Sequence, residues 1–193
     1  MTALRTLLAD EAPLLAEHLA RLSPEDRRLR FGGAILHPDA IRRYVDTIDW
    51  RHSFNIGAFD RAMLRGVAQI ILPRPGRAAD PAFPPTRDGA AEFAVSVEKP
   101  WQRRGLGTRL MAQMVVVARN RNVRDLFMLC LPENEAMRRL ARKVGVKLVF
   151  ANGEMSGHVD LPAPDQITVF AEFAVETAAA FDRWADLVVR MPG

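Results

Sequence analysis

The chain has 193 residues, 49% hydrophobic and 26% charged, a composition ordinary for one globular domain with a substantial core. Its single cysteine, Cys130, excludes an internal disulfide and any cysteine-rich zinc site, and no apolar run is long enough to span a membrane. The formal net charge of +4 makes the chain basic, yet only 7% of residues are aromatic and no zinc-finger or RNA-binding motif occurs, which leaves nucleic-acid binding as a minor alternative.

The first part of the chain contains six segments with regular apolar spacing. They are a strand at 2–7, helices at 14–22, from 23 and at 41–48, and two hairpin strands at 54–59 and 63–72. On the first helix, His18 is expected to be a packed histidine rather than a ligand. The second helix begins at Ser23-Pro24-Glu25-Asp26, which supplies a capping hydroxyl, a proline at the first position and acids in the first turn.

The rest of the chain alternates between strands and helices. The segments are a proline-rich loop at 73–89, a strand at 91–97, a helix from 106 to about 121, a strand at 125–131, a helix from 134 to about 144, strands at 147–151 and 166–175, and a helical extension over 175–193. The polar stretch 152–165 is predicted to be a loop. No repeat or linker interrupts the pattern, which favours a single domain over 1–193 of mixed α/β class with a largely antiparallel sheet of about seven strands.

The turn Gln102–Thr108 is the most informative stretch. It joins the predicted strand 91–97 to the helix that begins at Leu106. A strand that turns at glycines into a helix directs several free backbone N–H groups at one spot, and the helix dipole favours an anion there. Arg103 and Arg104 add positive charge, and the turn therefore suits binding of a pyrophosphate.

Positive charge is concentrated around this turn. Residues 102–143 hold ten arginines or lysines against three acids, a balance of +7, which leaves the remainder of the chain at −3. An anionic cofactor would favour such a distribution. For most of these arginines, a solvated helix face is the alternative interpretation.

With these motifs the chain resembles the GCN5-related N-acetyltransferases, the GNAT superfamily. The acyl-CoA motif of that family, Gln/Arg-x-x-Gly-x-Gly/Ala, is matched by 102–107, and a second motif, an asparagine followed by an apolar helix ending in Lys-x-Gly, is matched by 132–146. The resemblance covers 2–175. The segments 22–31 and 91–95 look like those of the bacterial Pat-type protein lysine acetyltransferases, which act on metabolic enzymes such as acyl-CoA synthetases.

The resemblance implies the GNAT fold, whose sheet splays after residue 131, and acetyl-CoA as the co-substrate. The turn amides would hold the CoA pyrophosphate, and the edges of Val95 and Val97 would bind the pantetheine arm and polarise the acetyl carbonyl. Asn134 would reach the cofactor from the far wall, or would serve as a plain helix cap. The implied cofactor-binding residues are Val95, Val97, Gln102, Arg103, Arg104, Gly105, Leu106, Gly107, Thr108 and Asn134. No metal is expected.

Glu92 is the candidate general base. A lysine-type amine is almost wholly protonated near neutrality and must lose a proton before it attacks a thioester. Glu92 lies in an otherwise apolar strand, and the resemblance to Pat-type enzymes implies that a glutamate at this position acts as the general base. The alternative is an edge glutamate that faces water or an arginine. Glu98 is a poorer candidate. The tyrosine that often protonates the leaving thiolate is absent from 132–146, so the general acid stays open, with Cys130 and Ser96 as weak substitutes.

The expected function is N-acetylation of a primary amine, preferably a protein lysine, by direct attack in a ternary complex with acetyl-CoA. A small amine as acceptor is the alternative within the enzyme class. A catalytically silent acyl-CoA-binding regulatory module is the alternative outside it. Because Asp10 and Glu11 come early and no basic start precedes them, no secretion signal is expected and the predicted location is the cytoplasm. The oligomeric state, monomer or homodimer, is open.

Overall fold

The computed structural model describes residues 2–32, 37–72, 90–151 and 153–190, with the side chains of 38, 179 and 181–190 outside the description. The predicted loop 73–89 lies outside the described residues. The strands are β1 (Ala3–Thr6), β2 (Ser53–Asp60), β3 (Met63–Ile71), β4 (Ala90–Val97), β5 (Asp125–Cys130), β6 (Val149–Ala151) and β7 (Glu154–Asp160). The helices are α1 (Ala12–Arg21), α2 (Pro24–Phe31), α3 (Pro38–Asp46), α4 (Leu106–Asn120), α5 (Glu135–Lys143) and α6 (Gln166–Arg190), with short 3-10 turns η1 (Ala9–Glu11) and η2 (Lys99–Trp101).

The described strands form one sheet in the order β1-β2-β3-β4-β5-β7-β6. Every neighbouring pair is antiparallel except β4 and β5, which run parallel. The expected mixed α/β class with a mostly antiparallel seven-stranded sheet is therefore confirmed. The apolar run of β5 lies inside this sheet, as expected for a strand covered on both faces.

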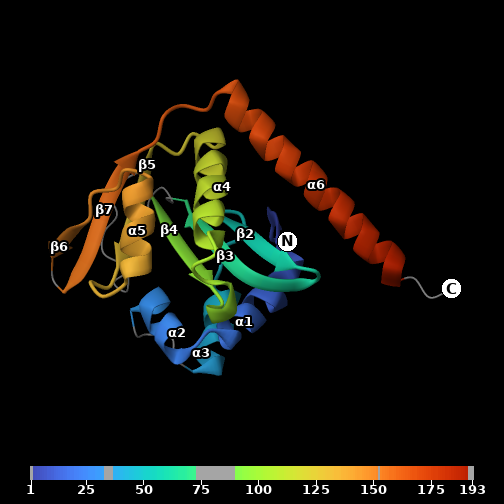
Figure 1. Ribbon diagram of the computed structural model, residues 1–193, viewed down its shortest axis with the longest axis horizontal. Helices are drawn as coiled ribbons and strands as arrows, with labels where there is room; N and C mark the ends of the chain where they lie inside the picture. Colours follow the sequence, from blue (N-terminus) through green and yellow to red (C-terminus); the bar gives the residue numbers. More distant parts are fainter. Residues whose placement is uncertain (1, 33–36, 73–89, 152, 191–193) are drawn as a thin grey trace.

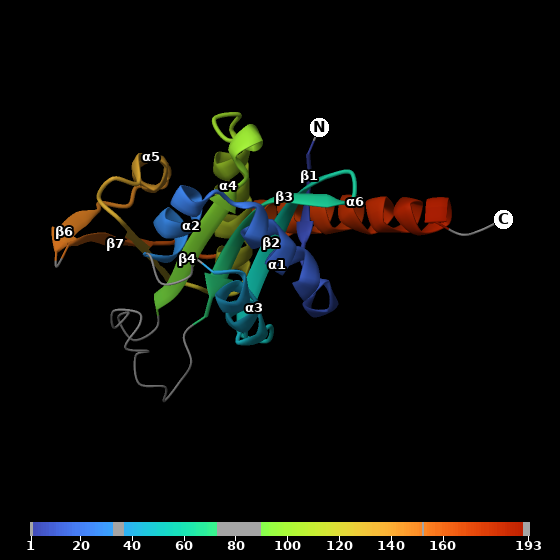
Figure 2. The ribbon, with the colours of Figure 1, turned by 90° about the horizontal axis from the view of Figure 1, so that it is seen from below.

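Helices cover both faces of the sheet. Helix α4 packs on β2, β3 and β4, and α6 lies beside α4 and β1 (Figure 1). On the opposite face, α1, α2 and α3 gather under β3 and β4 (Figure 2). Two apolar cores result, a larger one between α4 and the sheet and a smaller one around α1 and α3.

The helix starts follow local chemistry read from the sequence. At α2, the Ser23 side chain accepts a hydrogen bond from the Asp26 amide, and Pro24 occupies the first helical position. At α5, the Asn134 side chain accepts a hydrogen bond from the Met137 amide. These caps fix the ends of two helices that flank the functional site.

Two segments near the C-terminal end differ from the prediction. The strand predicted at 166–175 is wrong, because that stretch is the first part of α6. Asp165 accepts a hydrogen bond from the Thr168 amide at 2.8 Å, and Thr168 Oγ1 accepts one from the Asp165 amide at 3.1 Å, a reciprocal cap that starts a helix. The missing strand is β7, which lies within the predicted loop 152–165 and pairs with both β5 and β6.

Candidate functional site

The parallel strands β4 and β5 separate partway along their length. Their pairing ends at Phe93 opposite Met128, while β4 stays paired with β3 as far as Val97 opposite Gly66. The stretch from Ala94 to Val97 is therefore held on one side only. No strand of the described residues pairs with its other edge, which leaves backbone groups there to bind an extended ligand, apart from the Val97 carbonyl, which accepts a hydrogen bond from Gln102.

The turn after β4 has the geometry of an anion site. Arg103 and Gly105 both adopt positive φ, at 58° and 79°, and Gly105 is the N-cap of α4 without a side-chain cap. The first N–H groups of a helix have no partner within it, so those of α4 point out of the turn. A Cβ built on Gly105 would meet no atom within 4 Å, which leaves open space above the turn. A diphosphate fits there, with the helix dipole behind it.

Gln102 lines a cavity beside this turn and also braces the turn. Its Nε2 donates hydrogen bonds to the Val97 carbonyl and to Asp26 Oδ1, both at 2.9 Å. These bonds tie the turn to the end of β4 and to the start of α2. The function of Gln102 in this structure is thus to hold the turn in place.

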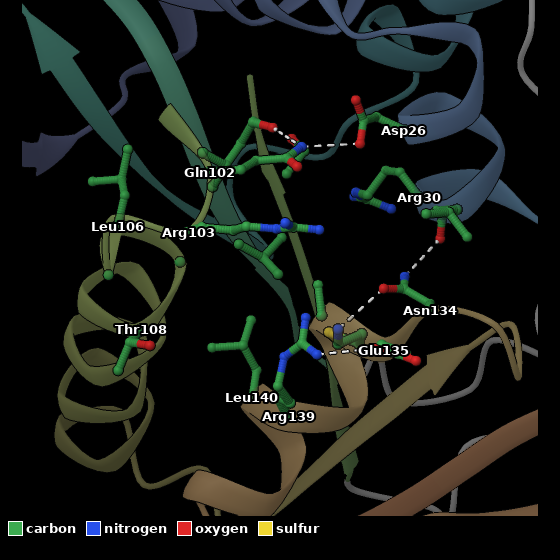
Figure 3. A pocket seen from close by; sticks show the side chains of 18 of the residues that line it. Asp26, Arg30, Gln102, Arg103, Leu106, Thr108, Asn134, Glu135, Arg139 and Leu140 are labelled. Carbon is green, nitrogen blue, oxygen red and sulfur yellow. Dashed lines mark hydrogen bonds and ion pairs between the residues drawn. The ribbon is translucent and has the colours of Figure 1, made fainter. Parts of the chain in front are cut away.

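A cavity of about 880 Å³ opens beside the turn, between α4, α5 and α2. Of the predicted cofactor-binding residues, those that line it are Val95, Val97, Gln102, Arg103, Gly105, Leu106, Gly107, Thr108 and Asn134. Figure 3 shows the Arg103 side chain reaching from the turn into this cavity. Arg104 is not among the described lining residues; its guanidinium instead lies 5.9 Å from the centre of the Trp101 ring.

The wall of the cavity opposite the turn carries both signs of charge, because Glu135 of α5 also lines the cavity and accepts a hydrogen bond from Arg139 at 2.9 Å (Figure 3). Arg139 and Lys143 of α5 both line the cavity, and Lys143 Nζ donates a hydrogen bond to Thr108 Oγ1 of α4 at 3.0 Å. Residues four apart on a helix share a face, so both cations point the same way. With Arg103 in the turn on the other side, the cavity is flanked by cations from the turn and from α5, which suits a polyanionic ligand.

Asn134 sits where α5 meets α2. Its Oδ1 caps α5, and its Nδ2 donates a hydrogen bond to the Leu29 carbonyl at 3.3 Å. The capping function left open by the sequence is present, and Asn134 also lines the cavity. A cap and a ligand contact are compatible at this position.

A buried polar network holds the other face of β4. His18 of α1 is fully buried, its Nε2 lies 2.9 Å from Ser96 Oγ, and its Nδ1 lies 3.4 Å from Glu98 Oε1. Burial lowers the pKa of His18, and the ring is therefore neutral near pH 7. Arg21 and Arg65 each donate to Glu98, at 2.8 and 2.9 Å.

This network determines the ionisation of the Glu98 carboxyl group. Although burial opposes ionisation, hydrogen bonds from His18, Arg21 and Arg65 lower the pKa of Glu98 to about 2. Such a carboxylate stays ionised and cannot act as a base near neutrality. Glu98 is therefore structural, in line with its lower rank as a candidate from the sequence.

Glu92 is half-buried on β4, in register with Ile71 of β3 and Phe127 of β5. Burial raises the pKa of its carboxyl, and the positive charge of Arg30 opposes this rise. Glu92 is not among the described lining residues of the cavity. Three residues of extended strand, roughly 10 Å, separate Glu92 from Val95. An amine that attacks a thioester beside Val95 would therefore pass its proton to Glu92 through water.

Arg30 belongs to a polar group on α2, α3 and β3 that the sequence did not reveal. Its Nη2 donates to Gln69 Oε1 at 3.1 Å and contacts the Tyr44 hydroxyl at 3.3 Å, while the Tyr44 hydroxyl donates to Gln69 Oε1 at 2.6 Å. Arg30 also lines the cavity. Tyr44, the only tyrosine of the chain, is thus engaged away from α5, where the family's general acid would lie.

The cavity residues missed by sequence reasoning come from α2 and α5. Those from α2 are Asp26, Leu29 and Arg30; those from α5 include Arg139, Leu140 and Lys143. The basic surplus over 102–143 already included Arg139 and Lys143, and their spacing on one helix face could have placed them. No sequence pattern predicted that residues of α2 would line this cavity.

The comparisons with known proteins agree on the family. Residues 19–146 match the family model described as the acetyltransferase (GNAT) family. Among solved structures, the GNAT domain of S. lividans PAT shares 22% identity with a TM-score of 0.67, covering 83% of this chain and 90% of that one. A cAMP-binding acyltransferase mutant from Mycobacterium smegmatis shares 25% identity with a TM-score of 0.53, covering 85% of this chain and 45% of that one.

A third solved structure contains a bound cofactor. The yncA protein from Salmonella typhimurium was solved with its cofactor acetyl-CoA; it shares 15% identity with a TM-score of 0.62, covering 86% of this chain and 99% of that one. At such low identity the likeness shows the fold alone. Among the helices of the described residues, none has the length and apolar character needed to cross a membrane.

Proposed function

Because the chain belongs to the acetyltransferase (GNAT) family, we propose that it transfers the acetyl group of acetyl-CoA to a lysine side chain of another protein. The reaction class and the acetyl donor follow from the family. The protein acceptor is inferred from the Pat-like segments 22–31 and 91–95, and the likeness to the GNAT domain of S. lividans PAT supports it.

The observation that carries the proposal is the cavity between the α4 turn and the free edge of β4. The open space over Gly105, the outward helix amides and the cations Arg103, Arg139 and Lys143 fit the diphosphate of CoA. Acetyl-CoA supplies an acetyl thioester. In this proposal the unpaired edge of Ala94–Val97 binds the pantetheine arm and donates a hydrogen bond to the acetyl carbonyl, which the end of the β4–β5 pairing at Phe93 supports.

Glu92 takes the proton of the amine in this proposal. Its raised pKa brings the carboxylate closer to the working range of a general base. The distance along β4 calls for a water between Glu92 and the amine. Ser96 also lines the cavity, and the His18 ring beside its hydroxyl keeps that side chain oriented.

A second candidate is an acyl-CoA-binding module without catalysis. It is favoured by one observation, that Glu92 is not among the residues that line the cavity in the described part of the chain. Such a module would bind acetyl-CoA at the turn and release no CoA in the presence of amines.

The test is CoA release from acetyl-CoA with three sets of acceptors: a folded acyl-CoA synthetase, lysine peptides, and polyamines or other small amines. The proposal expects release with the protein or the peptides above the rate without acceptor, and acetyl-lysine in the product. Release with small amines only would move the acceptor to the small-molecule class. Binding without release for any acceptor would favour the silent module.

A further inference from the structure

Helix α6 is attached to the molecule by its polar side. Glu172 accepts hydrogen bonds from Arg121 at 2.6 Å and from Asn120 at 2.7 Å, and Glu176 contacts Thr6 of β1. Asn120 also donates to the Thr168 carbonyl at 3.0 Å. The helix thus rests on α4 and β1 mainly through charges and hydrogen bonds.

Its apolar side faces solvent. Ile167 is 79% exposed, Phe170 71% and Phe173 67%. A surface helix ordinarily buries its apolar face and exposes its charges. In α6 the arrangement is inverted, and Figure 1 shows the helix running out past the rest of the molecule.

Many of the apolar residues follow a heptad repeat, with Phe173 beside the seam at a g position. Positions a and d, read from Ile167, are occupied in sequence by Ile167, Phe170, Ala174, Thr177, Phe181 and Trp184. All six charged residues of α6 lie off this seam, at b, c and f positions. Such a repeat is typical of a helix that pairs with another helix.

We propose that the outward face of α6 is an interface with a second copy of this chain, in which the two α6 helices pair antiparallel about a twofold axis near Thr177. With the axis near Thr177, an antiparallel pair sets position 174, an alanine, opposite position 181, a phenylalanine. A parallel pair would set alanine against alanine and phenylalanine against phenylalanine. Alternation of large and small residues across the seam favours the antiparallel pairing.

The available surface supports a dimer. Phe170 and Phe173 together offer roughly 200–350 Å² of exposed aromatic surface in the first half of the helix. The repeat continues over a helix about 37 Å long. A stable interface takes about 800 Å² from each partner, and the first half of the helix provides a substantial share of it.

The charges of α6 argue against a membrane as the occupant. A helix that lies on an anionic membrane has a polar face rich in lysine and arginine. The charged residues of α6 are four acids and two arginines. The polar face is therefore acidic, and a protein partner fits better than an anionic lipid surface.

The experiment measures the mass of the full chain by light scattering at micromolar concentrations. Wild type is expected to be a dimer, and F170E/F173E a monomer with unchanged circular dichroism and an unchanged thermal shift with acetyl-CoA. The control V149E/F150E changes another exposed apolar pair, on β6, and is expected to stay dimeric. A monomeric wild type, or a dimer that survives F170E/F173E, would overturn the proposal.

Two further measurements keep the test decisive if F170E/F173E does not fold. Under oxidation T177C is expected to form a covalent dimer and I167C is not, because the axis lies near Thr177. The native Cys130 is buried and is not expected to form the crosslink. Crosslinking of I167C as well as T177C would indicate a parallel pair and overturn the antiparallel arrangement. If wild type is monomeric and binds phosphatidylglycerol vesicles, the apolar face of α6 contacts a membrane and the proposed dimer is wrong.

Discussion

Ser96 Oγ of β4 lies 2.9 Å from Nε2 of His18 on α1, and both groups are buried. This pair joins the strand that carries the free edge of the cavity to the helix packed beneath it. The pairing of β4 with β5 ends before Ser96, so the pairing with β3 and the contact with His18 hold Ser96 in position.

The first prediction concerns the stability contributed by His18. Replacing His18 by Ala removes a fully buried ring and leaves Ser96 and Glu98 short of a partner, which should cost about 2–4 kcal/mol of unfolding free energy. Denaturant unfolding measures this. A cost below about 0.5 kcal/mol would mean that the network does not support β4.

The same histidine predicts a pH dependence. The pKa of His18 is lower in the folded than in the unfolded chain, so the unfolded state binds the proton first as pH falls below 6.5. Stability should then fall by up to about 1.4 kcal/mol per pH unit. Glu98, with a pKa of about 2, loses its contribution only below pH 4.5. Subtracting the profile of His18→Gln from that of wild type between pH 4.5 and 6.5 isolates His18; identical slopes would contradict the assignment.

The second residue to test is Glu92. Glu92→Gln should lower kcat more than about tenfold while acetyl-CoA affinity is retained, because the amide cannot take the proton. In wild type, the acid limb of the kcat/KM profile should lie above pH 4.5, since burial raises the pKa of this carboxyl. Unchanged turnover of the variant in the CoA-release assay would remove Glu92 from the mechanism.

Arg103 and Arg104 form a matched pair with different placement. Arg103 lines the cavity, whereas Arg104 lies beside Trp101. Arg103→Ala should raise the Kd for acetyl-CoA about tenfold or more, because a charge-assisted contact to phosphate is worth about 1.5–3 kcal/mol. Arg104→Ala should have a much smaller effect. Titration calorimetry at low and high salt compares them, and equal losses would argue for a diffuse charge effect.

Asn134 can be separated into its two functions by two substitutions. Asn134→Ala removes the cap of α5 and should cost about 1 kcal/mol of stability, whereas Asn134→Ser keeps a capping oxygen. If the amide also contacts acetyl-CoA, both variants should bind it more weakly although only the alanine unfolds earlier. Wild-type affinity in Asn134→Ser would leave Asn134 as a cap alone.

Much of the site could be predicted because its chemistry is local. A strand, a glycine turn with two arginines and a helix start lie within a few consecutive residues, and positive φ at Gly105 is what glycine permits. The cavity wall from α2 could not be predicted in the same way. Arg30 reaches the cavity because α2 packs against β4 and is hydrogen-bonded at Leu29 to Asn134, the cap of α5; these segments lie far apart in the chain.

The two errors near the C-terminal end have physical reasons. Residues 166–175 are rich in β-branched and aromatic side chains, which favour a strand locally, but the reciprocal cap of Asp165 and Thr168 starts a helix. The pattern Asp165-x-x-Thr168 at the start of this segment is the sequence feature that predicts the helix. In β7, a Cβ on Gly157 would lie 2.5 Å from the Lys147 carbonyl, so this glycine allows close backbone approach instead of marking a loop.

Hydrogen exchange with and without acetyl-CoA shows whether the backbone amides of 103–108 hold the diphosphate of acetyl-CoA. We expect slower exchange in the peptide covering 103–108 when acetyl-CoA is bound. Saturating binding detected by calorimetry with no change of exchange in that peptide, or the absence of binding by correctly folded protein, would contradict it.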